Sequence, residues 1–358
     1  MTSTPYVQRP DVAAGTPIQP TARDAEAARR ATSGEPLLSV RDLRVTFTRH
    51  GAQPFTAVDG VSFDVRPGQT VGLVGESGCG KSVTSLAIMG LLPERGNRVE
   101  GSVTYEGTDL LRLSSSQMRD RRGAELGMIF QDPLSSLNPV VPIGRQVTEV
   151  LERHRGMSKK AAMPIAREML DKVGIPDPDR RLKDYPHQLS GGMRQRALIA
   201  MALACQPRLL IADEPTTALD VTIQAQILTL LKELVEDTGT ALILITHDLG
   251  VVAGLCDEVN VLYGGRIVER GARHELFARP RHPYTTGLLA SIPRLDAPRG
   301  ARLTPVPGSV ADNLPWMSAC AFAPRCSQPI ERCVAETPEL QEQGDRALRC
   351  FNPVETSR

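Results

Sequence analysis

Apolar residues along the chain fall mainly into short, uninterrupted runs that are separated by polar or glycine-rich residues. These runs are Val71 to Val74, Met128 to Phe130, Leu209 to Ala212 and Ala241 to Ile245, and most are followed by helical periodicity. Strands that are buried on both faces have this appearance, because neither set of side chains meets water. The pattern therefore predicts a parallel sheet covered by helices.

Longer strand-like segments accompany this core. Leu37 to Thr48 and Phe55 to Val65 are separated by a turn region and predict an antiparallel β unit. Farther along, Glu258 to Tyr263 and Arg266 to Arg270 flank Gly264-Gly265, which is typical of a two-residue hairpin. The expected fold class is thus α/β, with a parallel-sheet core and an antiparallel β subdomain.

Three further segments complete the expected organisation. Residues 1–36 have too little apolar content to repay the entropy of ordering, which predicts a disordered tail. Residues 134–188 are charged, helical in pattern and interrupted by prolines, so we expect a helical insertion within a main domain that spans 37–280. Residues 281–358 lose clear periodicity and form an expected extension that carries four of the seven cysteines.

Composition and charge narrow the function. The 42 Lys and Arg residues nearly balance the 41 Asp and Glu residues, so the chain lacks the basic field of a nucleic-acid-binding protein and no nucleic-acid partner is expected. The apolar runs are far shorter than the roughly 20 residues that cross a bilayer, so membrane contact is expected to go through other proteins. The absence of an apolar signal core near Met1 predicts an intracellular location.

A phosphate-binding loop is predicted between an apolar run and a helical stretch. The segment matches G-x-x-x-x-G-K-S/T and reads Gly75-Glu76-Ser77-Gly78-Cys79-Gly80-Lys81-Ser82. Its glycines let successive N–H groups point at phosphates, and the helix N-terminus adds partial positive charge. We expect Lys81 to reach the β- and γ-phosphates of ATP, Ser82 to hold Mg²⁺, and the positive potential to activate the Cys79 thiol. The alternative is a tight turn that binds nothing.

A second acidic element follows the run Leu209 to Ala212. Asp213 is expected to hold the Mg²⁺ through water, which leaves Glu214 to orient or deprotonate the attacking water. A plain turn at the end of a strand is the alternative interpretation, and it fits less well beside a phosphate loop.

The segment Leu189-Ser190-Gly191-Gly192-Met193-Arg194-Gln195-Arg196 resembles the signature of ABC ATPases, with Met193 where many members carry Gln. Ser190 is a good helix N-cap, and Gly191 and Gly192 expose backbone N–H groups, so the segment suits a second anion. An ordinary capped helix is the alternative. The resemblance implies head-to-tail pairing, in which this signature closes over the ATP of a partner subunit.

The resemblance to ABC ATPases implies roles for further residues. Gln131 would contact the metal and the attacking water, Asp220 in Ala218-Leu219-Asp220 would lie at the dimer contact, and His247 would lie near the γ-phosphate. Phe47, or alternatively Phe55, would stack on adenine, although a plain core Phe is the other interpretation.

Two segments, Ser135-Ser136-Leu137-Asn138-Pro139 and His282-Pro283-Tyr284-Thr285, resemble the peptide-import branch of the family. That branch implies an ATP-hydrolysing subunit at the cytoplasmic face of the membrane that energises import of oligopeptides or dipeptides. Its implied partners are two transmembrane permease subunits, a second ABC ATPase, preferably of different sequence, and indirectly an extracytoplasmic solute-binding protein. Nickel or another small solute is the alternative cargo. A soluble ABC ATPase is disfavoured because the chain has one phosphate loop and no long coiled coil, and an inactive nucleotide-binding relative is disfavoured because Glu214 and His247 are present.

Four cysteines, Cys320, Cys326, Cys333 and Cys350, crowd the end of the chain. Their spacing lacks the C-x-x-C pairs that are typical of zinc ribbons. Some peptide-import members resemble this chain in carrying such a module, and in a subset it holds an iron–sulfur cluster. Three interpretations therefore stay open, namely a 4Fe–4S cluster, zinc, or free thiols in a loop-rich cap.

Overall fold

The structure is a computed structural model, and it describes residues 34–48, 51, 53–217, 219–292, 306–310 and 319–355. The predicted disordered tail, residues 1–36, lies almost entirely outside the described residues, and so does Ala218 of the predicted dimer-contact loop. The described residues from Pro36 onward form one compact unit.

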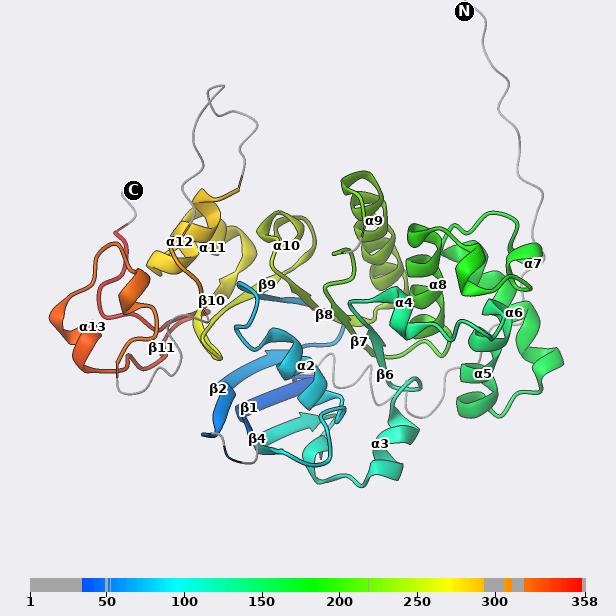
Figure 1. Ribbon diagram of the computed structural model, residues 1–358, viewed down its shortest axis with the longest axis horizontal. Coiled ribbons are helices and arrows are strands. Elements are labelled where there is room, and N and C mark those ends of the chain that lie inside the picture. Colours follow the sequence, from blue (N-terminus) through cyan, green and yellow to red (C-terminus); the bar gives the residue numbers. More distant parts are fainter. Residues whose placement is uncertain are drawn as a thin grey trace, which may run out of the picture. The chain divides into compact units, whose positions relative to one another are not determined.

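An eight-stranded sheet forms the core of this unit, in the order β11-β12-β10-β9-β3-β8-β7-β6 (Figure 1). Its centre is parallel, with β3 (Thr70–Val74) between β8 (Ala241–Thr246) and β9 (Glu258–Tyr263), and β7 (Leu209–Asp213) between β8 and β6 (Leu126–Ile129). Every residue of β3, β7 and β8 is buried. The predicted parallel core is confirmed, and burial of both faces explains the uninterrupted apolar runs.

A second, antiparallel sheet has the order β2-β1-β4-β5 and consists of β1 (Leu38–Phe47), β2 (Phe55–Val65), β4 (Asn97–Tyr105) and β5 (Thr108–Asp109). The predicted antiparallel subdomain is therefore confirmed. The sequence did not reveal β4, because only Val103 and Tyr105 of its nine residues are buried. Pairing with β1, not apolar alternation, determines this strand.

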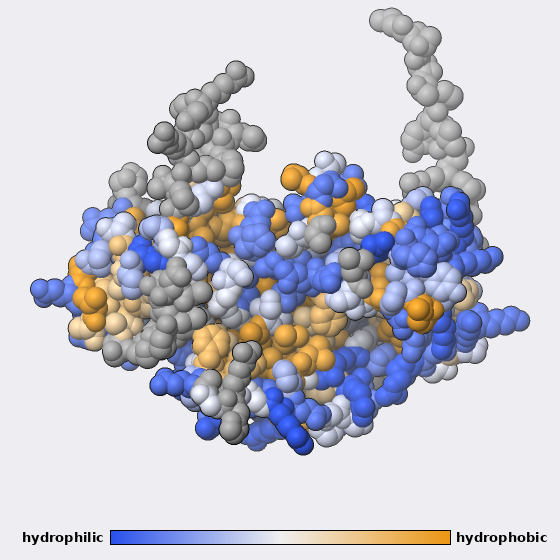
Figure 2. Space-filling view, viewed as in Figure 1, coloured by the Kyte–Doolittle hydropathy of each residue, from blue (hydrophilic) through white to orange (hydrophobic). Residues whose placement is uncertain are grey.

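Helices pack against the sheets and against one another. They include α2 (Lys81–Ile88), α3 (Ser115–Arg121), α8 (Gly191–Leu203), α9 (Val221–Thr238) and α10 (Leu249–Leu255), and residues 133–188 hold α4 (Pro133–Ser136), α5 (Ile143–Arg155), α6 (Lys159–Lys172), α7 (Pro178–Arg181) and the 3-10 turn η2 (Pro186–Gln188). On α5, Ile143, Val147 and Leu151 recur every four residues and are buried, which forms one apolar face. The opposite faces give the hydrophilic surface over α5, α6 and α7 (Figure 2). No helix in the described part of the chain is long and apolar enough to cross a membrane.

The C-terminal residues add to the main sheet. β10 (Arg266–Ala272) follows β9 through Gly264 and Gly265, whose φ angles of 57° and 74° suit the tight hairpin that the sequence predicted. Then come α11 (Arg273–Ala278), α12 (Pro283–Ala290), the 3-10 turn η4 (Ala323–Arg325), α13 (Glu331–Ala335), β11 (Gln341–Gln343) and β12 (Arg346–Leu348). β12 pairs with β10, so the expected extension from residue 281 contributes two strands to the sheet that carries β3.

Candidate functional site

The phosphate loop, residues 75–82, connects β3 to the start of α2. Gly75, Gly78 and Gly80 have φ angles of 152°, 83° and 96°, in a region that side chains disfavour. A Cβ on Gly75 would lie 2.3 Å from the Leu262 carbonyl oxygen, and one on Gly80 would lie 2.4 Å from the Ala57 carbonyl oxygen. Close backbone neighbours therefore require glycine at both ends of the loop.

Lys81 is the first residue of α2 and its side chain is only 4% exposed. Its ammonium group donates to the carbonyl oxygens of Gly75 at 2.7 Å and Glu76 at 2.9 Å, and Nζ lies 3.9 Å from Glu214 Oε1. The loop thus folds around its own lysine, which places a positive charge beneath the exposed residues Ser77 and Gly78.

Cys79 does not have the activated thiol that the sequence suggested. The residue is fully buried beneath the loop, and burial raises the pKa of its thiol, while the nearby Lys81 lowers that pKa by less. Because the thiolate is the reactive form, Cys79 acts here as a small apolar filler.

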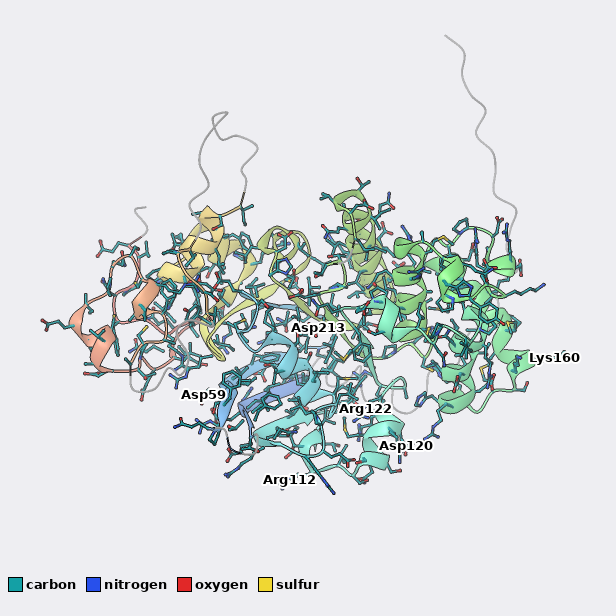
Figure 3. The ribbon with its side chains drawn as sticks, in the orientation of Figure 1. Asp59, Arg112, Asp120, Arg122, Lys160 and Asp213 are labelled. Atoms are coloured by element: carbon teal, nitrogen blue, oxygen red, sulfur yellow. The ribbon has the colours of Figure 1, made fainter. Side chains whose placement is uncertain are left out.

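Asp213, the last residue of β7, is labelled in Figure 3 and forms a polar pair with Ser82. Ser82 Oγ donates to Asp213 Oδ1 at 2.9 Å, and Ser85 Oγ donates to Asp213 Oδ2 at 3.5 Å. Burial raises the pKa of Asp213, and the hydrogen bond from Ser82 opposes that rise only in part. Mg²⁺ usually takes one or two protein oxygens together with phosphate oxygens and water, and a cation would favour the buried carboxylate, so this pair fits the predicted metal role.

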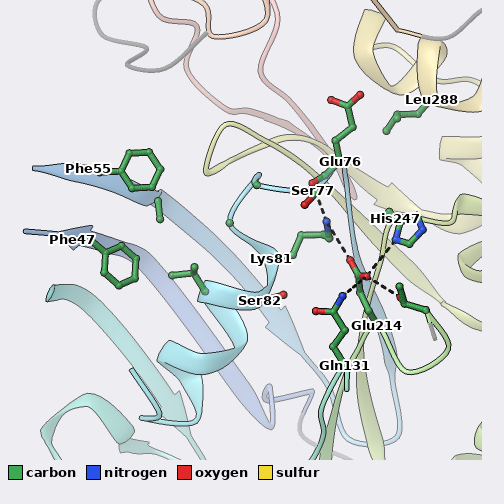
Figure 4. A pocket seen from close by; sticks show the side chains of 15 residues that line it. Phe47, Phe55, Glu76, Ser77, Lys81, Ser82, Gln131, Glu214, His247 and Leu288 are labelled. Atoms are coloured by element: carbon green, nitrogen blue, oxygen red, sulfur yellow. Dashed lines mark hydrogen bonds and ion pairs between the residues drawn. The ribbon is translucent and has the colours of Figure 1, made fainter. Parts of the chain in front are cut away.

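Glu214 is the meeting point of three side chains from different segments (Figure 4). Its Oε2 accepts hydrogen bonds from Gln131 Nε2 at 3.1 Å and from Thr217 Oγ1 at 2.9 Å, and it lies 3.4 Å from His247 Nδ1. Its backbone has a φ of 45°, a left-handed conformation that is strained for a residue with a side chain. The structure therefore brings Gln131, Glu214 and His247 together as expected, and adds Thr217, which no motif indicated.

A cavity of about 790 Å³ opens above these groups. It is lined by Phe47, Phe55, Ala57, Glu76, Ser77, Gly78, Gly80, Lys81, Ser82, Val83, Gln131, Glu214, Thr217, His247 and Leu288. Phe47 and Phe55, which face each other across β1 and β2, lie on the wall away from Glu214 (Figure 4). Leu288 comes from α12 of the extension and was not expected from the sequence.

The signature residues do not contribute to this cavity. Ser190 caps α8, where its Oγ accepts a hydrogen bond from the Met193 backbone N–H at 3.3 Å, and Ser190 and Gly191 are exposed. None of the lining residues just named belongs to Ser190–Met193. Asp220 likewise caps α9 by accepting from the Ile223 N–H at 3.0 Å. Both segments are capped helix N-termini, and Ser190, Gly191 and Asp220 are exposed.

The four C-terminal cysteines lie near one another without forming a metal site. Burial raises the pKa of Cys350 to about 11; a hydrogen bond from the Asn352 backbone opposes this rise, and the proximity of Cys320, Cys326 and Cys333 adds to it. Across the described residues, no three or more His, Cys, Asp or Glu side chains are arranged to hold a metal ion. The 4Fe–4S cluster and the zinc site, two of the three interpretations of these cysteines, are therefore not supported.

Comparisons with known proteins agree with this geometry. A family model described as ABC transporter matches residues 58–217, and one described as the C-terminal region of oligopeptide/dipeptide transporters matches residues 268–333. The chain is 56% identical over 300 residues to the dipeptide transport ATP-binding protein DppD of Bacillus subtilis, covering 84% of this chain and 89% of that protein. It is 50% identical over 319 residues to the oligopeptide transport ATP-binding protein OppD of Salmonella typhimurium, covering 89% and 94%.

A solved structure is also similar. It is a dimeric ATP-binding cassette in a post-hydrolysis state with ADP and Pi bound, and it matches with a TM-score of 0.59 and 28% identity. The match covers 66% of this chain and 98% of that chain.

Proposed function

Because this chain belongs to the ATP-binding subunits of the ABC transporter family, we propose that it hydrolyses ATP to energise the import of oligopeptides or dipeptides across the cytoplasmic membrane. The observation that carries the proposal is the convergence of Gln131, Thr217 and His247 on Glu214, 3.9 Å from the ammonium group of Lys81. A carboxylate that is held by several donors beside a phosphate-loop lysine is what phosphoryl transfer to water requires.

The mechanism follows from these positions. The loop N–H groups and Lys81 bind the phosphates of ATP, and Phe47 or Phe55 stacks on the base. Glu214 orients the attacking water and accepts its proton, while Gln131 and Thr217 keep the carboxylate oxygen in place. Ser82 and Asp213 would hold Mg²⁺, which would neutralise charge on the phosphate oxygens. His247 lies 3.4 Å from Glu214 Oε2 and lines the cavity, where it would contact the terminal phosphate.

A second subunit completes the site in this proposal. Ser190, Gly191, Gly192 and Met193 form a capped helix N-terminus that is not among the residues lining the cavity in the described part of the chain. The similar solved cassette is dimeric with ADP and Pi bound, which supports pairing of this kind. We place Asp220, at the exposed start of α9, at the contact between the two subunits, and we favour a partner ATPase of different sequence.

The remaining partners follow from the proposed transport role. Two transmembrane permease subunits would hold the ATPase at the cytoplasmic face of the membrane, and a solute-binding protein outside would deliver the peptide. The relatives named for dipeptide and oligopeptide transport support this cargo class.

The test is reconstitution of the full chain with its permeases, its partner ATPase and its binding protein in proteoliposomes. We expect ATP-dependent accumulation of a labelled dipeptide or oligopeptide, and stimulation of ATP hydrolysis by the loaded binding protein. Uptake of nickel but of no peptide would change the assigned cargo to nickel and leave the proposed ATPase role unchanged. Hydrolysis that responds neither to permeases nor to any solute would contradict the transport role.

A further inference from the structure

The C-terminal part of the chain reaches the phosphate loop directly. We propose that Arg325, in the four-cysteine module (residues 319–355), is a positioning residue of the ATP site that holds the phosphate loop through Glu76. The proposal rests on the proposed ATP binding by that loop, and it makes the module a component of the ATP site.

The link is a two-pronged ion pair across 249 residues of sequence. Arg325 Nη1 donates to Glu76 Oε2 at 2.6 Å, and Nη2 donates to Glu76 Oε1 at 2.9 Å. The Arg325 side chain is only 3% exposed. Surface ion pairs contribute little because water screens them, but here the guanidinium is buried, the Glu76 carboxylate is 30% exposed, and the bidentate geometry restricts how the two groups can lie.

Backbone carbonyl groups hold the guanidinium of Arg325 from the other side. Nε donates to the Pro307 carbonyl oxygen at 2.6 Å, and Nη2 also donates to the Gly308 carbonyl oxygen at 3.1 Å. The hydroxyl group of Tyr263, at the end of β9, accepts from Nη1 at 3.4 Å. These hydrogen bonds restrict the guanidinium to one orientation, so Arg325 can hold the Glu76 carboxylate in place.

A second contact from the extension reaches the same loop residue. The Glu76 backbone N–H donates to the hydroxyl group of Tyr284 at 2.9 Å, and Tyr284 lies on α12, fully buried. The ring of Tyr284 packs on that of Phe322, three residues before Arg325, with 5.4 Å between the ring centroids. The side chain and the backbone of Glu76 are thus both held by residues beyond position 280.

Holding Glu76 matters because the loop also seats the phosphate-binding lysine. Lys81 Nζ donates to the Glu76 carbonyl oxygen, so a shift of Glu76 would shift one of the two carbonyl groups that position the ammonium group. Glu76 also lines the nucleotide cavity, as does Leu288 of α12 (Figure 4). Release of Arg325 would therefore alter the affinity for ATP and its turnover together.

The experiment compares variants of the full chain in its assembled complex. Arg325→Gln and Glu76→Gln break the ion pair, Arg325→Lys keeps the charge without the two-pronged geometry, and Tyr284→Phe removes the second contact. Arg332→Gln is the matched control, because Arg332 lies in the same module but pairs with the exposed Glu336. For each variant we would measure the melting temperature, the Kd for a non-hydrolysable MgATP analogue, and kcat and KM for ATP.

We expect Arg325→Gln and Glu76→Gln each to weaken analogue binding and to lower kcat by about tenfold, with KM raised and with Arg325→Lys intermediate. The double variant should be no worse than either single variant, since both break one interaction. Arg332 also stacks over the Phe351 ring, 4.1 Å from its centroid, so we expect Arg332→Gln to lower the melting temperature slightly but to match the wild type in Kd, kcat and KM.

Two results would overturn the proposal. One is a lower melting temperature for Arg325→Gln with Kd, kcat and KM per folded molecule equal to those of the wild type, which would leave Arg325 a scaffold residue only. The other is fully additive losses in the double variant. If the wild type binds the analogue but does not hydrolyse ATP, the proposed function fails while the Kd series still decides the role of Arg325. If the wild type binds no nucleotide, both fail.

Discussion

Two glycine-rich segments lead into helix N-termini in this chain, and they differ in what surrounds them. The phosphate loop before α2 is enclosed, since Lys81 is buried and Asp213 and Glu214 lie against it. The signature before α8 is open, since Ser190 and Gly191 are exposed and the Ser190 hydroxyl group serves its own helix. Similar local chemistry thus lies in two settings: the phosphate loop has Lys81, Asp213 and Glu214 of its own chain around it, whereas the signature, in the proposed function, acts only against the nucleotide of a second subunit.

The largest effect should come from removing the carboxylate at the enclosed site. Glu214→Gln keeps the shape and the contact with Thr217 but cannot accept a proton from water. We expect kcat to fall by about a thousandfold or more while ATP binding persists, measured by steady-state hydrolysis and equilibrium binding. Lys81→Ala is the useful contrast, since it should abolish binding itself. Wild-type turnover by Glu214→Gln would exclude Glu214 as the base.

The open site offers a substitution that should leave the enclosed site intact. A side chain fits at Gly191, where a Cβ would come no closer than 3.6 Å to Leu219, and an Asp there would suit the start of α8. Its negative charge would repel the γ-phosphate bound by a partner subunit. We expect Gly191→Asp to lower turnover by about a hundredfold, with unchanged nucleotide affinity of the isolated chain and an unchanged or higher melting temperature.

The result for Gly191→Asp distinguishes a signature that contacts the nucleotide of its own chain from one that contacts the nucleotide of a partner subunit. Loss of affinity in the isolated chain would mean that the signature touches the nucleotide of its own subunit. Unchanged turnover in the assembled complex would mean that the signature has no part in hydrolysis.

The sequence located the residues that meet in the enclosed site because they lie in contiguous motifs at strand ends. The apolar runs located β3, β7 and β8, and parallel strands bring their carboxyl ends to one edge, so Lys81, Glu214 and His247 could be expected to meet. Thr217 was missed because a hydroxyl group three residues from a carboxylate is common in any turn.

Long-range contacts of the extension could not be predicted in the same way. The phosphate-loop pattern leaves the residue after Gly75 open, so nothing marked Glu76, and Arg325 lies 249 residues away. The iron–sulfur interpretation of the four cysteines came from the family resemblance and not from their spacing, and the described residues do not support it, because proximity alone does not create a ligand set. Sequence motifs therefore predict residues that act close together in the chain, whereas contacts between distant segments, such as Arg325 with Glu76, are not contained in any motif.

A smaller effect should appear at the buried carboxylate of the enclosed site. Burial raises the pKa of Asp213 in the folded state above its value in the unfolded chain. The folded state is therefore favoured by this group at a pH below the unfolded pKa, where the carboxyl group is protonated. This contribution to the free energy of unfolding is lost as the pH rises through the folded pKa. At neutral pH, without a cation, the carboxylate therefore lowers the free energy of unfolding. Asp213→Asn should raise the nucleotide-free melting temperature by about 2 °C at pH 7 and should weaken Mg²⁺-dependent ATP binding by about tenfold.

Calorimetry at pH 7 and at pH 4 checks the sign for Asp213, since the gain should shrink at the lower pH, where the carboxylate takes up its proton. Binding measured with and without Mg²⁺ checks the metal role. A variant with lower stability at pH 7 and with unaltered Mg²⁺ dependence would contradict both parts.

The smallest expected effect lies on the aromatic wall of the enclosed site, where Phe47 and Phe55 face each other across β1 and β2. Phe47 is partly buried and Phe55 is 40% exposed, so Phe47 offers the more rigid stacking surface. Base–aromatic stacking contributes about 1–3 kcal/mol per base, so we expect Phe47→Ala to weaken ATP binding about fivefold or more, and Phe55→Ala to weaken it less. Stacking tolerates any base, so GTP binding should fall in parallel. A larger loss of affinity in Phe55→Ala than in Phe47→Ala would assign the base to Phe55. If both variants bind ATP with the affinity of the wild type, adenine lies on neither ring.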